Sequence, residues 1–261
     1  MHRSVHLPRL PRWPRLPRWT SAALAILLFA AARPAPVRAD EMISIHGHAG
    51  AVKLGNRTQP ARDSTATVWL AADRLRRDEG GLTVIVRLDR HMLYLINHAD
   101  RTYSQVQVPI DWTKMVPPND QESFTKYLAD NEINATITPS TENRKIRTWN
   151  THRVDVLLTN KHGLKMATHM WLSTDLPLYA EYNKMAAILA SLQPNASSWS
   201  QKVGSLDGIP VYQETTITIG QSESQTLEEI VAADTKPAPQ GTYDVPAGFT
   251  AVPYDPFHTP Q

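Results

Sequence analysis

The sequence contains no cysteine in its 261 residues. Without a thiol the chain can form no disulfide, bind no metal through a thiolate and carry no lipid on an N-terminal cysteine as bacterial lipoproteins do. An apolar run long enough to span a membrane is also missing. The run at 21–32 has 12 residues and ends at Arg33 and Pro34, whereas a spanning helix needs about 20. We therefore expect no permanent transmembrane anchor.

Acidic residues are absent from the first 39 positions, which contain seven arginines and no lysine. Removing these seven from the 27 basic residues leaves 20, against 25 acidic residues in 40–261. The formal charge of +2 therefore hides a mildly acidic remainder, which gives no electrostatic case for binding nucleic acid. Apolar residues make up 41% of the chain, enough for a substantial core.

The first 39 residues follow the order of a secretory signal peptide. A basic, Pro- and Trp-rich n-region at 1–20 precedes the apolar h-region at 21–32, and Val37 and Ala39 are small residues suited to a cleavage site. Proline and arginine each recur every three residues within 7–19. By itself this pattern would also suit a polyproline helix that binds an anionic membrane or a proline-binding domain. Its place before an h-region favours the signal peptide. We expect cleavage after Ala39 and a periplasmic protein.

Alternation of apolar and polar residues predicts strands through most of the remaining chain. The expected strands are 65–71, 82–89, 91–97, 102–108, 134–138, 144–149, 152–159, 164–173, 208–220 and 224–234. Helical spacing predicts helices at about 119–130 and at 178–193.

No repeat or linker divides the chain after the signal peptide, so we expect one α+β domain at 40–235. Its long antiparallel sheet should curl into a half-barrel, with two or three helices over the concave face. A Pro-rich tail at 236–261 should dock partly on this domain, with 242–246 as an edge segment.

Motifs of the common enzymes are missing. The chain has no GxSxG, HExxH, phosphate loop, GxGxxG or EF-hand loop. Ser123 and Lys126 match SxxK, and Lys161-His162-Gly163 loosely resembles KTG. The two elements lie under 40 residues apart with no SxN between them, which does not suit a penicillin-binding enzyme. We predict a non-enzymatic protein without a cofactor.

Histidines give the only hint of a metal site. On a strand, His46 and His48 would share one face and could bind a metal together. No nearby third ligand completes the site, and Gly47 between them favours a loop. His162 and His169 could contribute only if the fold brought them close. We predict no metal site, with His46 and His48 as the candidates if one exists.

Several strands carry apolar residues on both faces, as in 91–97. An ordinary one-sided sheet exposes polar residues on its outer face, so such strands are covered by helices or by a ligand. Methionine and large aromatic side chains suit an adaptable apolar lining. The candidate lining residues are Trp69, Val84, Val86, Tyr94, Trp171, Tyr182 and Met185.

Short motifs spread over about 65–253 resemble a family of small exported bacterial proteins of unknown function. The first group of matching positions is Asp73, Arg74, Leu75, Arg76, Gly80, Gly81, Ile85, Arg87, Asp89 and Tyr103. Further matches are RKIRTWNTHRVDVLLT, MWLSTDLP, GIPVYQETT and YDVPAGFTAVP, although Trp149-Asn150-Thr151 replaces an expected Gly-Tyr and a frequent cysteine is missing. The resemblance implies a fold similar to the periplasmic lipoprotein-localisation carriers, with helices as a lid over an apolar cavity.

These observations support three hypotheses. The first is a periplasmic protein that binds an apolar or lipid-like ligand, or a lipidated partner, between sheet and helices. The second is an envelope structural or interaction protein with a filled core, whose sheet edge or Pro-rich tail contacts a protein partner. The third, a metal-binding protein or hydrolase, would need a histidine cluster.

Overall fold

The computed structural model describes residues 39–54, 57–196 and 199–255. Residues 1–38, and with them nearly all of the expected signal peptide, lie outside this range. The helical segments are η1 (Leu88–Arg90), α2 (Trp112–Met115), η2 (Pro118–Asp120), α3 (Gln121–Asp130), α4 (Tyr179–Ala190) and α5 (Ser200–Gly204).

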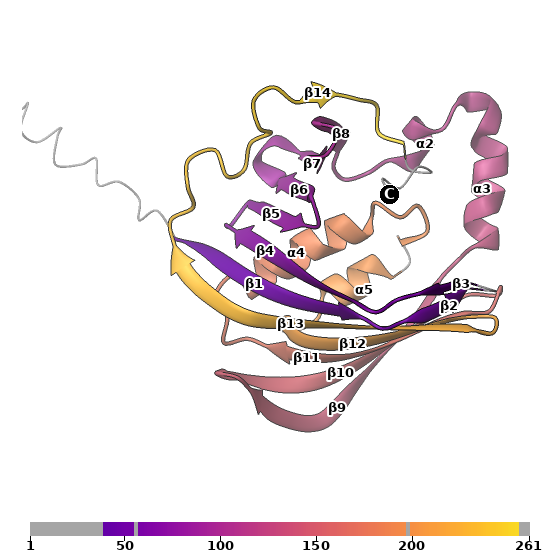
Figure 1. Ribbon diagram of the computed structural model, residues 1–261. Helices are drawn as coiled ribbons and strands as arrows, with labels where there is room; N and C mark the ends of the chain where they lie inside the picture. Colours follow the sequence, from indigo (N-terminus) through magenta and orange to yellow (C-terminus); the bar gives the residue numbers. More distant parts are fainter. Residues whose placement is uncertain (1–38, 55–56, 197–198, 256–261) are drawn as a thin grey trace, which may run out of the picture. The chain divides into compact units, whose positions relative to one another are not determined.

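Most of the strands form one large sheet (Figure 1). In chain order they are β1 (Asp40–Ala49), β4 (Arg62–Leu70), β5 (Arg74–Glu79), β6 (Leu82–Arg87), β7 (Met92–Asn97), β8 (Thr102–Gln107), β9 (Asn134–Ile146), β10 (Trp149–Thr159), β11 (Leu164–Ser173), β12 (Ile209–Ile219), β13 (Ser222–Lys236) and β14 (Thr250–Ala251). A separate short hairpin consists of β2 (Val52–Leu54) and β3 (Arg57–Gln59).

The 12 strands of the sheet lie in the order β14-β8-β7-β6-β5-β4-β1-β13-β12-β11-β10-β9. Every pairing is antiparallel except that of β14 with β8. Strand β1 lies between β4 and β13, and therefore joins a meander of early strands to a meander of late ones. Strands twist relative to their neighbours, so a sheet this wide curls instead of staying flat, as Figure 1 shows.

Helices α4 and α5 lie on the concave face of the curled sheet (Figure 1). Met185 of α4 is fully buried in an apolar cluster that includes Ile43, Val68 and Val211 from three different strands; we call it the main cluster. A second cluster, around Val156, packs against Trp199 and other residues at α5. Both clusters lie on the helix-covered face. The expected α+β fold, a curled half-barrel with helices on its concave face, is confirmed.

Most of the predicted elements match observed ones, but β1, the strand that joins the two meanders, has no counterpart among the predicted strands. Strand 164–173 has the predicted bounds, and the predicted helix at 119–130 appears as η2 followed by α3. The two strands expected at 134–138 and 144–149 mostly merge into β9, whose register with β10 shifts between His152 and Val154. Such an irregularity lets one strand continue through a bend.

Two local expectations are wrong. Gly47 lies inside strand β1, not in a loop, and a Cβ at this position would come within 2.5 Å of the Ser64 Oγ. The absence of a side chain at Gly47 thus leaves room for the Ser64 hydroxyl of the neighbouring strand. Residues 242–246 are not the edge segment; β14 takes that place. The earlier segment instead crosses a face of the sheet, because the Tyr243 ring is buried in an apolar cluster there.

The helix cover can be tested at Met185. We expect Met185→Ala to lower the free energy of unfolding by about 2–5 kcal/mol, because a fully buried side chain leaves a cavity. The neighbouring exposed residue supplies a control, and Lys184→Ala should stay within about 0.5 kcal/mol of the wild type. Urea unfolding followed by circular dichroism measures both. Equal stability of the two variants would mean that α4 does not pack as described.

Candidate functional site

An apolar pocket of about 410 Å³ opens where β6, β7 and β8 meet the C-terminal segment. Val84 and Leu95 form part of its wall and also pack against the main cluster, so the pocket belongs to the concave face. The complete lining is Leu82, Thr83, Val84, Leu95, Ile96, Asn97, Asp100, Thr102, Tyr103, Ser104, Val252, Pro253, Tyr254 and Asp255. Apolar side chains from the strands and from the tail thus enclose one hollow.

The pocket exposes large apolar side chains to solvent. Leu82 is 41% exposed and Val252 is 39% exposed, although both belong to large apolar residue types. Ser104 is the cross-strand neighbour of Leu95. It contributes a small side chain, whose hydroxyl donates to the Pro253 carbonyl at 3.2 Å. A hollow with exposed apolar walls is a typical binding surface.

The C-terminal segment is attached to the sheet edge beside this pocket. The Thr250 amide donates to the Arg101 carbonyl at 2.9 Å, and the Val252 amide donates to the Tyr103 carbonyl at 2.9 Å. Farther along, the Tyr254 ring lies 6.4 Å from the Trp112 ring, centroid to centroid. The tail is therefore a wall of the pocket and is tied to it at several points.

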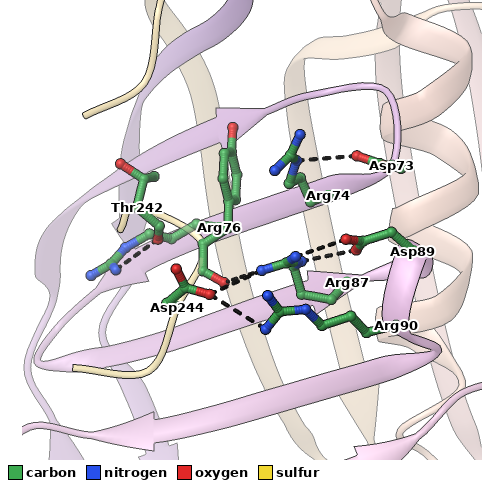
Figure 2. A network of polar contacts seen from close by, with 9 residues as sticks. Asp73, Arg74, Arg76, Arg87, Asp89, Arg90, Thr242 and Asp244 are labelled. Atoms are coloured by element: carbon green, nitrogen blue, oxygen red, sulfur yellow. Dashed lines mark hydrogen bonds and ion pairs between the residues drawn. The ribbon is translucent and has the colours of Figure 1, made fainter. Parts of the chain in front are cut away.

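Before it reaches the edge, the tail is tied to the opposite, convex face by an arginine clamp of Arg76, Arg87, Asp89 and Asp244 (Figure 2). The Arg87 Nη1 donates to the Asp244 Oδ1 at 3.0 Å and to the Tyr243 carbonyl at 3.1 Å. Its Nε and Nη2 donate to the two Asp89 oxygens at 2.8 and 2.7 Å. Arg87 is 6% exposed, so these bonds are largely shielded from water.

Arg76 completes the clamp by donating to the Thr242 carbonyl at 3.0 Å. The hydrogen bond from Arg87 holds the pKa of Asp89 below its usual value, against a smaller opposing effect of burial. Burial is also the main cause that raises the pKa of Tyr243. The Arg76, Arg87 and Asp89 positions are among those on which the family resemblance rests. Their physical role here is to hold the tail.

A charged triad, formed by Arg77, Glu79 and Glu228, borders the pocket. The Arg77 Nη2 donates to the Glu79 Oε2 at 2.7 Å and to the Glu228 Oε1 at 2.8 Å. In the register of β5 with β6, Arg77 is paired with Val84, and Glu79 with Leu82. Cross-strand partners share a face, so two members of the triad stand directly beside the pocket wall.

Polar neighbours extend the triad. The Ser64 hydroxyl donates to Glu79 at 3.2 Å, and the Gln213 amide donates to Glu228 at 2.5 Å. Burial would lower the pKa of Arg77, but Glu228, Tyr182 and Glu79 together raise it above its usual value. Tyr182 of α4 is close to the triad: burial raises the pKa of its phenol, Arg77 opposes this and Glu228 adds to it.

The seven predicted lining residues divide between the two faces. Val84 lines the pocket, and Val84, Val86, Tyr182 and Met185 all belong to or pack against the main cluster. Val86 and Met185 are completely buried there. The structure therefore brings these four together on the concave face.

The three other predicted residues lie on the convex face. The strand neighbours of Trp69 and Tyr94 belong to the main cluster on the concave face or pack against it. Trp69 and Tyr94 themselves point to the other face and pack with Tyr243, beneath the tail. Trp171 lies on the opposite side of its strand from Met170, which packs in the second cluster. The Arg144 guanidinium lies over the Trp171 ring, 3.8 Å from the ring centroid. Trp171 lines a separate polar hollow of about 260 Å³. Alternation along a strand separates them from the other four.

The candidate histidines lie on a strand and share a face, as their spacing allows. The His48 Nδ1 is 2.7 Å from the Asp63 Oδ1, and the His46 Nε2 is 3.8 Å from the same oxygen. Within the described part of the chain, no group of three or more histidine and carboxylate side chains is arranged to hold a metal ion. His162 bonds to the Asp130 carbonyl and His169 to the Asp155 carboxylate.

Sequence reasoning missed the clamp and the triad. A signal for both was present, because β5 reads RLRRDE and places arginine and acidic residues on each face of a strand. Charged residues are seldom buried unless they are paired. Such a strand in the middle of a protein therefore indicates ion pairs, although it does not identify the partners.

A family model described as a domain of unknown function, DUF4412, matches residues 56–249. No curated protein sequence matches the chain. Among solved structures, PNGF-II is similar over 83% of this chain and 31% of its own, with a TM-score of 0.40 and 10% identity. An outer membrane lipoprotein-sorting protein domain from Vibrio parahaemolyticus is similar over 85% of this chain and 95% of its own, with a TM-score of 0.29 and 9% identity.

The family match confirms the predicted resemblance to a family of unknown function. The chain spans about a third of PNGF-II. In the residues that the structure describes, no helix has the length and apolar character needed to cross a membrane.

The clamp can be tested by proteolysis. We expect Arg87→Met to release the tail, so that chymotrypsin cuts after Tyr243 and Phe249 about tenfold faster than in the wild type, as local opening becomes easier. Arg90→Met is the control, because Arg90 is 54% exposed and reaches Asp244 only at 3.5 Å. Mass spectrometry of the fragments gives the rates. Equal rates in both variants would contradict the clamp.

The lowered pKa of Asp89 predicts a pH dependence. A carboxyl with a lowered pKa stabilises the folded state fully above its unfolded-state pKa, and this contribution is lost as pH falls through the folded-state pKa. We expect Asp89→Asn to be less stable than the wild type at pH 7 by about 1 kcal/mol. The difference should shrink as pH falls below the ordinary value of 3.8. In an Arg87→Met background it should be small at every pH; urea unfolding from pH 7 to 2.5 measures both.

Proposed function

We propose a function for this chain, which belongs to the DUF4412 family of unknown function, on the basis of its pocket: it binds an apolar or lipid-like ligand, or the lipid of a lipidated partner, at the concave face. The binding step involves no covalent chemistry. The ligand's apolar chain lies against Leu82, Val84 and Leu95, with the C-terminal segment as the opposite wall.

The observation that carries this proposal is the pocket of about 410 Å³ with exposed apolar walls. Its volume lies within the usual range of about 300–1,000 Å³ for small-molecule sites. Each methylene group of a ligand that leaves water contributes about 0.8 kcal/mol, so a chain of a few carbons is enough for measurable affinity. Val84 and Leu95 of the pocket wall also pack against the main cluster, so this wall is anchored in the core.

A non-enzymatic role is supported by the polar groups beside the pocket. Thr83 contacts both Asp78 and His98, at 2.5 and 2.8 Å. An activated nucleophile needs its base oriented by a third group, whereas here the carboxylate bonds to the hydroxyl and not to the imidazole. Thr83 is also 1% exposed. These three residues stabilise the fold and offer no reactive centre to a substrate.

The proposal places the protein in the bacterial periplasm. Its support is the order of basic, apolar and small residues in 1–39, which is typical of a cleaved signal peptide. A lipid-binding protein in this compartment would find its ligands in the adjoining membranes.

A second candidate function is that of an envelope interaction protein without a ligand. It is favoured by β9, which is the last strand in the sheet order and is largely exposed over its 13 residues. An edge strand can pair with an extended segment of a protein partner. This function requires no lipid, so the next experiment separates the two candidates.

Lipid extraction tests the proposal directly. We expect protein purified without detergent from the periplasm of a bacterial host to release a stoichiometric lipid or fatty acid into organic solvent, as measured by mass spectrometry. Protein that carries no lipid and does not bind the neutral apolar dye N-phenyl-1-naphthylamine would overturn the proposal and leave the interaction protein.

The location of the site is tested by a matched pair of variants. We expect Leu82→Asp to weaken dye binding at least about tenfold, because a charged group in the pocket wall must be desolvated when the dye enters. Ile219→Asp makes the same change at a 59% exposed residue outside the pocket lining, and should bind as the wild type does. Fluorescence titration measures both. Equal weakening, or none in Leu82→Asp, would place the dye elsewhere.

A further inference from the structure

The pocket and the charged triad are parts of one surface. Leu82 and Val84 line the pocket, and their direct partners across the β5–β6 pairing are Glu79 and Arg77. Glu228, on β13, accepts a hydrogen bond from the same Arg77 side chain. An apolar hollow therefore passes into a charged patch within one strand spacing, about 5 Å. This is the arrangement that an amphiphile needs, with a site for its chain next to a site for its polar end.

The triad is accessible. The side chains of Arg77, Glu79 and Glu228 are 23%, 37% and 35% exposed, respectively. They are not sealed in the core, although they lie on the face that carries both apolar clusters. Polar groups on an otherwise apolar face fix the orientation of ligands in many binding sites.

The charges of the triad do not cancel. One arginine faces two carboxylates, and a single nitrogen of Arg77 donates to both of them. The groups that donate to the remaining carboxylate oxygens are neutral, namely the Ser64 hydroxyl and the Gln213 amide. The group therefore has a net charge of −1, and the one cation within it is already engaged by both carboxylates.

We infer that the proposed ligand is an amphiphile with a protonated primary amine at its polar end, bound by the carboxylates of Glu79 and Glu228. This inference rests on the proposed function and specifies its ligand class. A primary ammonium carries three N–H donors and no acceptor, which matches two carboxylates that still have lone pairs free. An anionic head would meet a patch of its own sign and find Arg77 occupied.

Tyr182 supports the same choice. Its ring packs against the main cluster, on the face that carries the triad, and both Arg77 and Glu228 affect the pKa of its phenol. A phenol oxygen accepts a hydrogen bond from an ammonium. Carboxylates from β5 and β13 and a phenol from α4 are thus presented on the same face of the sheet.

Three probes with the same decyl chain test this inference: decylammonium, 1-decanol and decanoate, each measured by displacement of N-phenyl-1-naphthylamine at pH 7 in low salt. We expect decylammonium to displace the dye at a concentration about tenfold lower than decanoate does, with decanol between them. Since the chain is constant, the order of the probes reports only on the polar end.

Variants assign the preference to the triad. Glu228→Gln keeps the shape and removes one charge, and it should reduce the preference for decylammonium over decanoate to about threefold or less. Glu223→Gln is the control. It makes the same change on the same strand at an exposed residue outside the triad, and should keep the preference. Glu79→Gln is a second variant in case Glu228→Gln fails to fold, which urea unfolding would reveal.

The outcomes separate this inference from the function on which it rests. The inference of an amine head group is overturned if decanoate binds as tightly as decylammonium, or if both Glu228→Gln and Glu79→Gln keep the preference. Either result still allows apolar ligands to bind in the pocket. If none of the three probes displaces the dye and the purified protein carries no lipid, the proposed function fails together with the inference. A preference that is lost in either triad variant and kept in Glu223→Gln supports it.

Discussion

The pairing of β1 with both β4 and β13 is the constraint on which the rest of the structure depends. One meander lies on each side of β1, and no other strand in the described sheet joins them. The register sets Gly47 opposite Ser64 on one side and opposite Glu228 on the other. Glu228 on β13 contacts Arg77 on β5 across the two intervening strands, β1 and β4, where Gly47 and Ser64 contribute little or no side chain. A pairing shifted by one residue would move every side chain of β1 to the other face.

The C-terminal segment connects the two faces of the sheet. On the convex face the arginine clamp and the buried ring of Tyr243 hold its first part. At the edge, β14 pairs with β8, and the residues after it form a wall of the apolar pocket on the concave face. The pocket's shape therefore depends on contacts made on the opposite side. Ion pairs suit this role, because shielded arginine and carboxylate groups are specific in geometry and costly to separate.

Apolar side chains face both sides of several strands, and the reason differs between the faces. On the concave side, helix α4 and the strands exclude water from the main cluster. On the convex side the tail covers Trp69 and Tyr94. The pattern in 91–97 correctly indicated that both faces are covered, but it could not indicate by what. A helix and an irregular tail bury apolar area equally well, so the cover leaves no distinct mark on the strand.

The sequence by itself determined most of the strands, the two longer helices and the α+β class, because alternation and helical spacing follow from local backbone geometry. It also indicated which segments carry apolar residues on two faces. It did not predict β1, the strand that joins the two meanders. Only the tertiary structure decided which face each residue occupies and what lies opposite it. Val84 and Trp69 are similar candidates in sequence, yet they lie on opposite sides of the sheet. The triad assembles residues 77, 79 and 228, and the clamp joins residue 87 to residue 244. Pairings at such distances in the chain depend on register and topology, which no local pattern encodes.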